Sequence, residues 1–568
     1  MKKIYGFAAL SAAMLLASCS NEGQEPNMDP TNSSLETCYI AVNLAAPGDE
    51  TRADNDDNAL PGESTVKDFK LVVFDQNNDV ILTTPALTID SEWVNGTGEV
   101  SLKTKEPKIV TVNKVADQTI SGIICIANAP ANLTYTTSDN LEKVRKDLLN
   151  KCYIEEGSTK YFTMTNAAIV NTTAEGTPAS YMAVPTADNI ATSPTAAKSK
   201  PINIYIERVA ARVDAVQKDS FDTSKAADEC TDENGNSIKL HVVLTGMDFY
   251  KTPENANLVK NIDSFAGSSY ISTIPFTGWN ESLRSHWGEN CNDPNCLSLF
   301  FSTATPVDAS GSELAANAYR KASSHKFEVG TTSKYLQEFM PNGDNLTVAD
   351  KTAIILTGYI AKEGENTPYT DGIYQLWQDG NYYTKNGALT NLADYLTAEG
   401  YVWKKTENGT TTTTSVSATD LDLQDGYENY DAYVKINAKS DYTLYKGSEA
   451  TTPAAVNAAI KSTAKASANS TYRVYVYGNS NTYFYATIQG EDNGTKMPAG
   501  LVRNHIYEIN MVGIGGLGNP KREPNTEIIP TPIDKTNEGG DKSYFATTIN
   551  IIKWKAYTQS VNFGTQTN

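Results

Sequence analysis

Apolar and polar residues alternate along most of this chain, and this period of two limits the fold more than any other feature. The first clear case is a set of four apolar residues near the N-terminus, at Cys38, Ile40, Val42 and Leu44. Alternation of this kind is typical of a strand that buries one face. A single isolated segment, 141–150, has the apolar spacing of a helix. The sequence therefore predicts an all-β protein.

Further strands are expected along the whole chain, at 66–74, 79–83, 98–102, 108–112, 120–128, 239–250, 352–360, 372–383, 472–477, 482–488 and 506–512. The apolar run 201–216 changes phase near Arg208, which indicates a bulge or a strand that passes between domains. Two long polar insertions, 253–345 and 385–470, interrupt the pattern. Segments of that length must contain local structure of their own or serve a function.

The composition of the chain argues against some classes of function. The 568 residues include 47 Lys and Arg against 67 Asp and Glu, a net charge of −20. Because phosphates are bound by basic surfaces, this balance argues against nucleic-acid binding. The length suggests several folding units. No apolar run after the first 20 residues is long enough to span a membrane, so any attachment would come from the N-terminus.

The N-terminus has the features of a bacterial lipoprotein signal. Lys2 and Lys3 precede an apolar stretch, Ile4–Leu16, of the length of a secretory signal core. The sequence Leu-Ala-Ser-Cys that follows matches a lipobox and predicts lipidation of Cys19. The alternative is an ordinary signal peptide that contains a cysteine. Residues 20–34 are polar and rich in turn formers, as in a flexible tether.

The C-terminus carries one more strand behind a linker. Residues 519–543 contain four prolines and a Gly-Gly pair. The segment 544–554 then alternates again, with Phe545, Ile549 and Ile551 on one face, and Ile552 and Trp554 continue the apolar phase. Because an apolar strand alone in water exposes unpaired backbone groups, this strand needs a partner.

No catalytic, cofactor or metal motif is supported. Gly513–Gly518 fits the spacing G-x-G-x-x-G, but a proline linker follows where a dinucleotide site needs a helix. Cys291 and Cys296 are close enough for a small disulfide, whereas a metal site with His286 would lack a fourth ligand. The aromatic residues Trp377, Tyr382 and Tyr383 could stack on sugar rings, although Tyr and Trp are also common strand residues. An enzyme is therefore not expected.

Seven segments, which cover most of the chain outside the two insertions, are informative together: the lipobox at Cys19, TRAD at 51–54, VKDFKLVVF at 66–74, IICIANAP at 123–130, IERVAARV at 206–213, RNHIYEIN at 503–510 and the last strand with Trp554. In their order and spacing they resemble the fimbrillins of Bacteroidales, the pilin subunits of type V pili, and among them the Mfa-type minor fimbrillin shaft subunits.

The resemblance implies a mechanism of assembly. A trypsin-like, Arg-specific protease would cut between Arg52 and Ala53, in the loop after the first strand. This cut would remove Cys19 with its lipid, together with the first strand, whose inward residues are Ile40, Val42 and Leu44. The groove left behind would accept the last strand of a neighbouring pilin subunit, through Phe545, Ile549, Ile551, Ile552 and Trp554. Because groove and donor are different surfaces, such contacts build a filament.

The resemblance also implies the domain order. Residues 1–19 would be the signal peptide, 20–52 the removed propeptide, and 519–568 the linker with the donor strand. Two transthyretin-like β-sandwich domains would span 53–208 and 209–518. The precursor would reach the outer membrane through its lipid, and the mature subunit would join a cell-surface fimbrium that supports adhesion to an unidentified host or bacterial ligand.

Two alternatives stay open at this point. The chain could be a tip adhesin of the same kind of pilus, although the resemblance implies that tip subunits lack the last strand. It could also be a glycan-binding lipoprotein of the cell surface that keeps Cys19 as its anchor and binds sugars through Trp377, Tyr382 and Tyr383.

Overall fold

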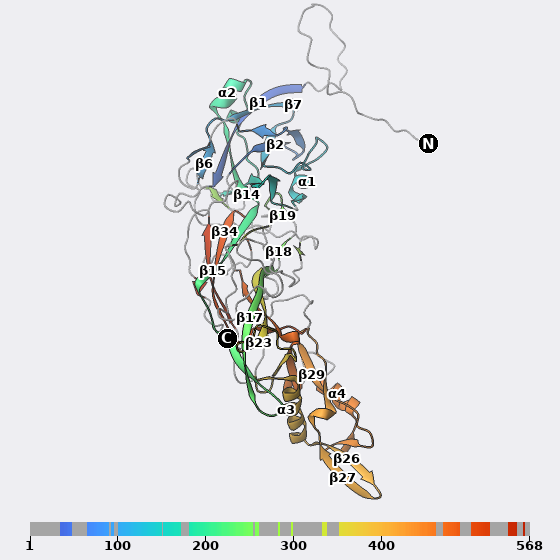
Figure 1. Ribbon diagram of the computed structural model, residues 1–568. Coiled ribbons are helices and arrows are strands. Elements are labelled where there is room, and N and C mark those ends of the chain that lie inside the picture. Colours follow the sequence, from blue (N-terminus) through green and yellow to red (C-terminus); the bar gives the residue numbers. More distant parts are fainter. Residues whose placement is uncertain are drawn as a thin grey trace, which may run out of the picture.

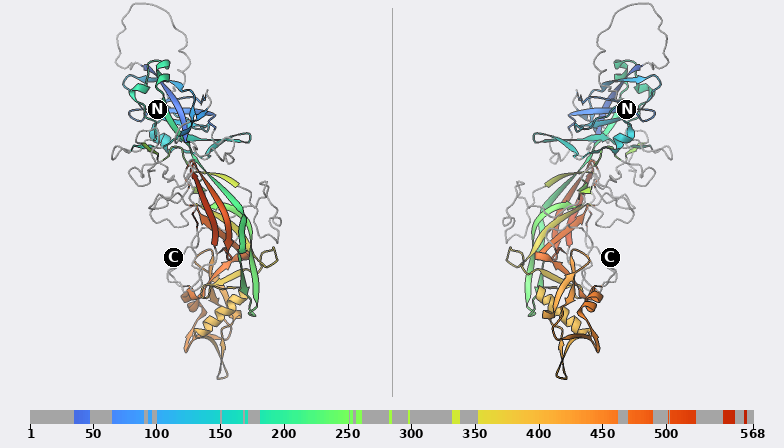
Figure 2. Two further views of the ribbon diagram at one scale, coloured as in Figure 1. Left: turned by 90° about the vertical axis from the view of Figure 1, so that its left-hand side faces the viewer. Right: turned by 90° about the vertical axis from the view of Figure 1, so that its right-hand side faces the viewer.

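The computed structural model describes most of the predicted strands. The residues it describes are 35–47, 65–89, 93–95, 100–149, 151–167, 169–171, 181–250, 252–253, 256–260, 282–284, 297–298, 332–337, 352–461, 470–488, 501, 503–522, 544–553 and 561–562. These residues form an elongated molecule, with the strands nearest the N-terminus at one end and a small lobe built from 385–461 at the other (Figures 1 and 2).

The N-terminal region, residues 35–208, is built on one curved sheet of ten strands. Eight of them follow one path, in the order β3 (Val80–Thr83), β2 (Asp68–Asp75), β8 (Ile120–Ala127), β12 (Met164–Asn166), β14 (Ile202–Arg208), β1 (Leu35–Pro47), β6 (Val100–Thr104) and β5 (Trp93–Asn95). Two more join from the side: β4 (Leu87–Thr88) pairs with β2, and β7 (Lys108–Val115) pairs with β1. The sheet encloses a core whose buried side chains come mainly from β1, β2, β7, β8 and β14, with Met164 of β12.

The single helix expected from the sequence is shorter than predicted. The prediction placed it at 141–150, but α1 covers only Leu141–Lys146 and ends at Asp147, whose backbone is extended. Leu148 and Leu149 form instead a short strand, β9, which pairs with β19 (Ala256–Asn257) from a distant part of the chain. The tertiary pairing therefore overrides the local helical spacing. A second helix, α2 (Pro194–Ser199), packs against β1 (Figure 1).

The phase change near Arg208 marks the passage between two sheets. β14 ends at Arg208 in the N-terminal sheet, and β15 (Ala210–Lys225) begins two residues later in a different sheet. Val209 between them is buried, and its amide donates to the carbonyl of Thr163. Of the two readings left open by the sequence, the structure supports the strand that passes between sheets.

The C-terminal region, residues 210–522 with the last strands, contains two sheets that face each other across a core. The five-stranded sheet runs β22 (Thr332–Gln337), β15, β34 (His505–Gly515), β36 (Tyr544–Lys553) and β37 (Val561–Asn562). The ten-stranded sheet runs β28 (Leu421–Asp425), β29 (Asp431–Ile436), β32 (Arg473–Tyr477), β24 (Ile373–Leu376), β25 (Tyr382–Tyr383), β16 (Ala227–Thr231), β17 (Ser237–Tyr250), β23 (Ala353–Lys362), β33 (Asn481–Thr487) and β35 (Asn519–Pro520). Side chains from β15 and β34 meet those from β17 and β23 in one buried cluster.

The insertion 385–470 has its own structure, as its length required. Its described part contains α3 (Lys385–Ala398), α4 (Pro453–Ile460) and a four-stranded sheet, β27 (Thr410–Ser415), β26 (Tyr401–Glu407), β30 (Thr443–Lys446) and β31 (Glu449–Thr451). These elements form the lobe at the end of the molecule farthest from β1 (Figure 1). They share a separate core around Trp403 and Leu392.

Three further two-stranded ladders complete the described strands: β10 (Tyr153–Glu156) with β11 (Thr159–Phe162), β13 (Ile169–Asn171) with β20 (Ser282–Arg284), and β18 (Thr252–Pro253) with β21 (Leu297–Ser298). The dominance of strands confirms the predicted all-β class. The assignment of two transthyretin-like domains, and the donor role of the last strand, stay predictions.

Candidate functional site

β1 is an inner strand of the N-terminal sheet, with neighbours along both edges. On one edge it pairs in parallel with β14, where Val42 lies opposite Ile202. On the other edge it pairs antiparallel with β7 from Leu35 to Val42, and then with β6. Figure 1 shows β1 at the N-terminal end of the molecule, beside β7 and α2. Loss of β1 would therefore open the sheet in its interior rather than at its edge.

The side chains of β1 contribute to the centre of the N-terminal core. Ile40 and Leu44 are fully buried, and Val42 is 1% exposed. They pack in one cluster with apolar residues of β2, β7, β8 and β14. Complete burial of a side chain of this size stabilises the fold by roughly 1.5–3 kcal/mol relative to exposure. These apolar residues therefore face the core, as the alternation in the sequence predicts. Their role in a strand that is displaced during assembly stays a prediction.

The backbone of β1 also forms hydrogen bonds near the places where its pairing with neighbouring strands changes. Tyr39, next to the start of the β14 ladder, forms two hydrogen bonds with Ala191, one through its amide and one through its carbonyl. The amide of Leu44 donates to Oγ1 of Thr104 at 3.2 Å, at the point where the partner changes from β7 to β6. Removal of β1 would leave these partners without their bonds.

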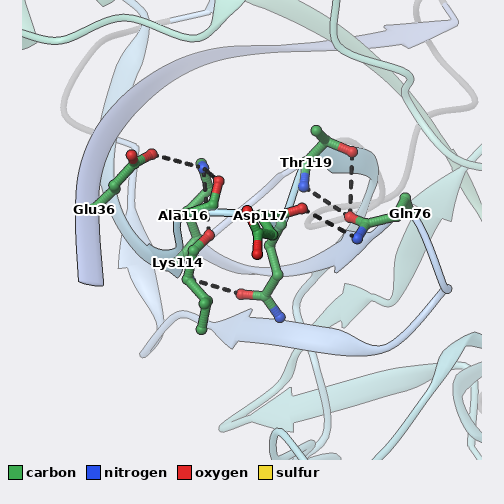
Figure 3. A network of polar contacts seen from close by, with 8 residues as sticks. Glu36, Gln76, Lys114, Ala116, Asp117 and Thr119 are labelled. Carbon is green, nitrogen blue, oxygen red and sulfur yellow. Dashed lines mark hydrogen bonds and ion pairs between the residues drawn. The ribbon is translucent and has the colours of Figure 1, made fainter. Parts of the chain in front are cut away.

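An ion pair joins the start of β1 to β7. Lys114 Nζ lies 3.0 Å from Glu36 Oε2, and it also donates to the carbonyl of Ala116 at 3.3 Å. The side chain of Lys114 is 12% exposed, so the ammonium is largely shielded from water. Figure 3 shows Glu36 reaching Lys114 beside a turn that Gln76 holds through hydrogen bonds to Thr119. The ion pair could not be predicted from the sequence, because nothing near Glu36 indicates which lysine it contacts.

The predicted processing residues lie outside the described residues. Cys19 precedes β1, and Arg52 and Ala53 fall between its end at Pro47 and the next described residue, Thr65. A cut after Arg52 would nevertheless separate all of β1 from the rest of the chain. The chain order thus allows one cut at the predicted position to remove both the predicted lipid site and an inner strand.

The last strand pairs within its own chain. β36 runs antiparallel to β34, from Tyr544 opposite Gly515 to Lys553 opposite His505, with one register shift. In this ladder Phe545 lies opposite Ile514, and Ile549 lies opposite Ile509. Ile551 and Ile552 pair further along the same ladder, with Tyr507 and Ile506. Trp554 lies outside the described residues. The structure therefore brings the predicted donor strand to β34 and not to β1.

The segment around Arg503 holds the two regions of the molecule together. Arg208 Nη1 donates to Oδ1 of Asn504 at 3.0 Å, and Asn504 N donates to the carbonyl of Ala210 at 2.7 Å. Arg503 donates to the carbonyls of Leu258 and Asn257. All three polar side chains, those of Arg208, Arg503 and Asn504, are buried. Through these contacts, residues 503 and 504 connect the end of β14 with the start of β15 and with residues 257–258.

A buried ion pair lies at the same junction. Lys260 Nζ is 2.7 Å from Glu207 Oε1, with side-chain exposures of 1% and 0%. Leu258 and Val259, just before Lys260, pack in a core cluster with residues of β2 and β8. A segment that follows β17 and β18 in the chain thus inserts into the N-terminal region. Since it has no apolar alternation, the sequence did not indicate this contact.

The structure argues against a sugar platform at Trp377, Tyr382 and Tyr383, one of the two interpretations that the sequence left open. Tyr382 and Tyr383 are 5% and 6% exposed, and they belong to two different cores. Because a stacking platform must present ring faces to solvent, these two residues cannot form one with Trp377. Their burial agrees with the alternative reading, that they are ordinary strand residues.

The glycine-rich segment is a strand end followed by a turn, as the sequence indicated. β34 ends at Gly515, and Gly516 and Gly518 have φ angles of +64° and +77°. A Cβ on Gly518 would lie 2.2 Å from Thr482 Oγ1, so only glycine fits there. β35 follows directly, and no described helix begins there to bind a pyrophosphate.

Cysteines and acidic groups give no metal site among the described residues. No group of three or more His, Cys, Asp or Glu residues there could hold a metal ion. Cys38, Cys125, Cys152 and Cys230 are buried free thiols. Burial raises the pKa of Cys230 to about 11 and that of Cys152 to about 12. Cys291, Cys296 and His286 lie outside the described residues. No described helix is long and apolar enough to span a membrane.

Several solved structures are similar to this chain at low sequence identity. A candidate cell adhesion protein from Parabacteroides distasonis is 13% identical, with 92% of this chain and 98% of that chain covered, at a TM-score of 0.36. The tip fimbrial protein Mfa3 from Porphyromonas gingivalis is 9% identical, with 90% and 99% covered, at a TM-score of 0.29. The fimbrial anchor protein Mfa2 from the same organism is 10% identical, with 92% and 100% covered, at a TM-score of 0.22.

Two family models match the chain directly. The model of the major fimbrial subunit protein FimA matches residues 38–239, and the C-terminal model of the type IV major fimbrial subunit protein, fimbrillin, matches residues 475–560. Together they span just over half of the chain and include both β1 and β36. A search of curated protein sequences gave no significant match. On these two models, which agree with the resemblance seen in the sequence, the chain belongs to the fimbrillin family of fimbrial subunit proteins.

Proposed function

We propose that this chain is a shaft subunit of the Mfa type. It is exported as a lipoprotein on Cys19, cut after Arg52 by a trypsin-like protease, and polymerised through its last strand. This proposal goes beyond the coarse function that the family gives: fimbrillins are structural subunits rather than enzymes, and they associate with other pilin subunits in a fimbrium at the cell surface.

The position of β1 is the observation that carries this proposal. β1 lies inside its sheet, its apolar side chains are buried, and the proposed cut lies beyond its end. A chain that loses β1 exposes an apolar groove and two rows of unpaired backbone groups, on β14 and on β7. Such a groove binds an added strand through main-chain hydrogen bonds and side-chain pockets.

β36 supports a shaft position rather than a tip. It is a ten-residue strand, and it follows a proline-containing linker that begins later than predicted, after β35 and Arg522 rather than at 519. A subunit with both a groove and a donor strand can contact one neighbour at each end. The contact is heterologous and does not close, so it extends into a filament.

The N-terminus of the surface form tests the proposal. Protein sequencing of subunits from sheared fimbriae is expected to begin at Ala53. A surface subunit that retains lipidated Cys19 would contradict the proposal, and would instead agree with a permanently anchored lipoprotein.

Substitution of Arg52 tests the need for the cut. Arg52→Ala and Arg52→Lys should both stop filament formation, because neither offers an Arg-specific protease its arginine. As the matched control, a chain in which Arg52 is replaced within the recognition sequence of an unrelated protease should polymerise only after that protease is added. Normal filaments from uncut Arg52→Ala subunits would overturn the proposal.

A further inference from the structure

Two short segments at opposite ends of the chain have the same order of residue types. Residues 36–44 in β1 read ETCYIAVNL, and residues 541–549 read DKSYFATTI. Each has a carboxylate, then Tyr three residues later, then an apolar residue, Ala, a β-branched residue, a polar residue and an aliphatic residue. Every tail residue is numbered 505 higher than its counterpart in β1, as 544 is to 39. Alternation alone does not require Tyr or Ala at these places, so the match needs another explanation.

The place of Ala41 is buried and is filled by a small side chain. Ala41 is fully buried although it lies on the face of β1 opposite the core residues, and α2 packs against β1. In the matching register, Ala546 occupies this place. A shift of two residues is the smallest that keeps the same face inward. It would put Thr548 or Tyr544 there, and either side chain is larger than the space Ala41 fills.

The core-facing places are also suited to the matching register. The inward residues of β1 that are no more than 1% exposed are Ile40, Val42 and Leu44. Their counterparts in the tail are Phe545, Thr547 and Ile549. Thr547 has the branched shape of Val42 with one added hydroxyl. A shift of one residue would instead bring Asn550 to the place of Leu44, where an amide would be buried in an apolar core.

The charged end of β1 has a counterpart as well. Lys114 on β7 is held by Glu36 at 3.0 Å and by the carbonyl of Ala116 (Figure 3). Departure of β1 removes the carboxylate and leaves a shielded ammonium at the end of the groove. Asp541 stands in the tail where Glu36 stands in β1. An incoming tail in this register would return an acidic residue to Lys114.

We propose that the tail of a second copy of this chain replaces β1 residue for residue. Its direction is that of β1, parallel to β14 and antiparallel to β7, and Tyr544 takes the place of Tyr39. Phe545 and Ile549 then fill the core, whereas Ile551 and Ile552 continue past Leu44 alongside β6. This inference rests on the proposed function and specifies the register of the exchanged strand.

Disulfide trapping between subunits tests the register. Asn203 on β14 is exposed and lies opposite Asn43 of β1, whose tail counterpart is Thr548. Filaments of the full chain that carry Asn203→Cys together with Thr548→Cys should form a ladder of covalent oligomers under oxidising conditions, seen on non-reducing gels. Directly opposed strand residues are close enough for a disulfide. The matched variants Ala546→Cys and Asn550→Cys, each combined with Asn203→Cys, should not form the ladder.

The outcomes separate the register from the exchange itself. A ladder through position 546 or 550 instead of 548 would overturn this register and leave strand exchange intact. Filaments with no ladder at any of the three positions would show that the tail does not lie beside β14, against both proposals. Variants with only one of the two cysteine substitutions measure the background of disulfide formation that does not come from the designed pair.

A second cysteine pair tests the position of the tail against β7, on the other side of the groove. Thr111 on β7 is exposed and lies opposite Tyr39, whose proposed counterpart in the tail is Tyr544. Filaments that carry Thr111→Cys together with Tyr544→Cys should therefore form a disulfide between subunits. This pair serves if the Asn203→Cys chain does not fold. A tail inserted in the opposite direction cannot satisfy both pairs, and failure of this pair in filaments trapped through Asn203 would overturn the proposed direction.

Discussion

The two strands at the ends of the described chain, β1 and β36, are held in very different ways. β1 has neighbours on both edges, and its core face is buried among residues of five other strands. β36 is paired along one edge with β34, while on its other edge β37 meets only Thr548 and Ile549. A strand bonded on both sides cannot leave without opening the core, whereas a strand near a sheet edge can leave by melting one ladder. The comparison explains why the first strand would need a covalent cut and the last would not.

Loss of the last strand should have the largest effect. A chain that lacks 544–568 retains the groove but has no donor, so it should form no filaments of its own. When mixed with cut wild-type subunits it should end their growth, which electron microscopy can measure as shorter filaments. A chain that lacks only 564–568, beyond β37, is the control and should polymerise normally. Unchanged filaments after the larger deletion would contradict the role of β36.

Truncation of a core side chain in β1 should strongly destabilise the precursor. Leu44 is fully buried, and Leu44→Ala should lower the free energy of unfolding by about 2–5 kcal/mol. Leu35 lies in the same strand but is 72% exposed, so Leu35→Ala should change it by less than about 0.5 kcal/mol. Denaturant unfolding of the Arg52→Ala precursor measures both. In filaments, where β1 would be absent, the two variants should behave alike; a difference there would mean that β1 is retained.

Thiol labelling can follow the groove as it opens and closes. Cys125 is fully buried in the core that β1 covers, and this burial raises the pKa of its thiol, so it should react slowly in the precursor. After the cut and release of β1, its rate with iodoacetamide should rise at least about tenfold, and a peptide of residues 541–553 should suppress it again. Cys230, buried in the C-terminal core, is the internal control. A Cys125 rate that does not respond to the cut would indicate that no groove opens.

Hydrogen exchange can test whether β36 leaves β34. Amides of β34 that bond to β36 should exchange faster in filaments than in the precursor, by about tenfold for each 1.4 kcal/mol of lost protection. Amides of β17, which pairs with β23 in the other sheet, should not change. If β34 stayed equally protected, the tail would have to donate without leaving its own sheet.

The charge pair at the start of the groove should have the smallest effect. Lys114→Glu would face Asp541 in the proposed register, and it should slow the growth of cut subunits several-fold, since a partly exposed pair is worth about 0.2–1 kcal/mol. Asp541→Lys in the same chain should restore the rate, and added salt should weaken both effects. Absence of rescue in the double variant would separate Lys114 from Asp541.

The fold class and most strand positions were predictable, because alternation is a local signal. β2, β8, β17, β23 and β34 all lie where it placed them. Helix α1 ends earlier than predicted because Leu148 and Leu149 pair with residues more than a hundred positions away. The local spacing of apolar residues carries no information about such a distant pairing. The same limit applies to the sugar platform, because the residues that cover Tyr382 and Tyr383 come from other strands.

The site was predictable only in part. The inward residues of β1 follow from alternation, and the processing and donor residues came from the resemblance and stay predictions. The partner of Glu36 and the buried pair of Lys260 with Glu207 could not be inferred, because each joins segments that are distant in sequence. The shared order of residue types at 36–44 and 541–549 is the sequence signal on which the proposed register rests.

The junction near Arg208 has a mechanical consequence. Along the chain, the N-terminal and C-terminal sheets are joined through Val209, but 256–260 and Arg503 connect them a second time through buried contacts. Two bodies joined at one point bend freely, whereas two attachments resist both bending and twisting. A filament of such subunits would take up curvature at the joints between molecules and keep each molecule stiff, so its flexibility would depend on how tightly each tail is seated.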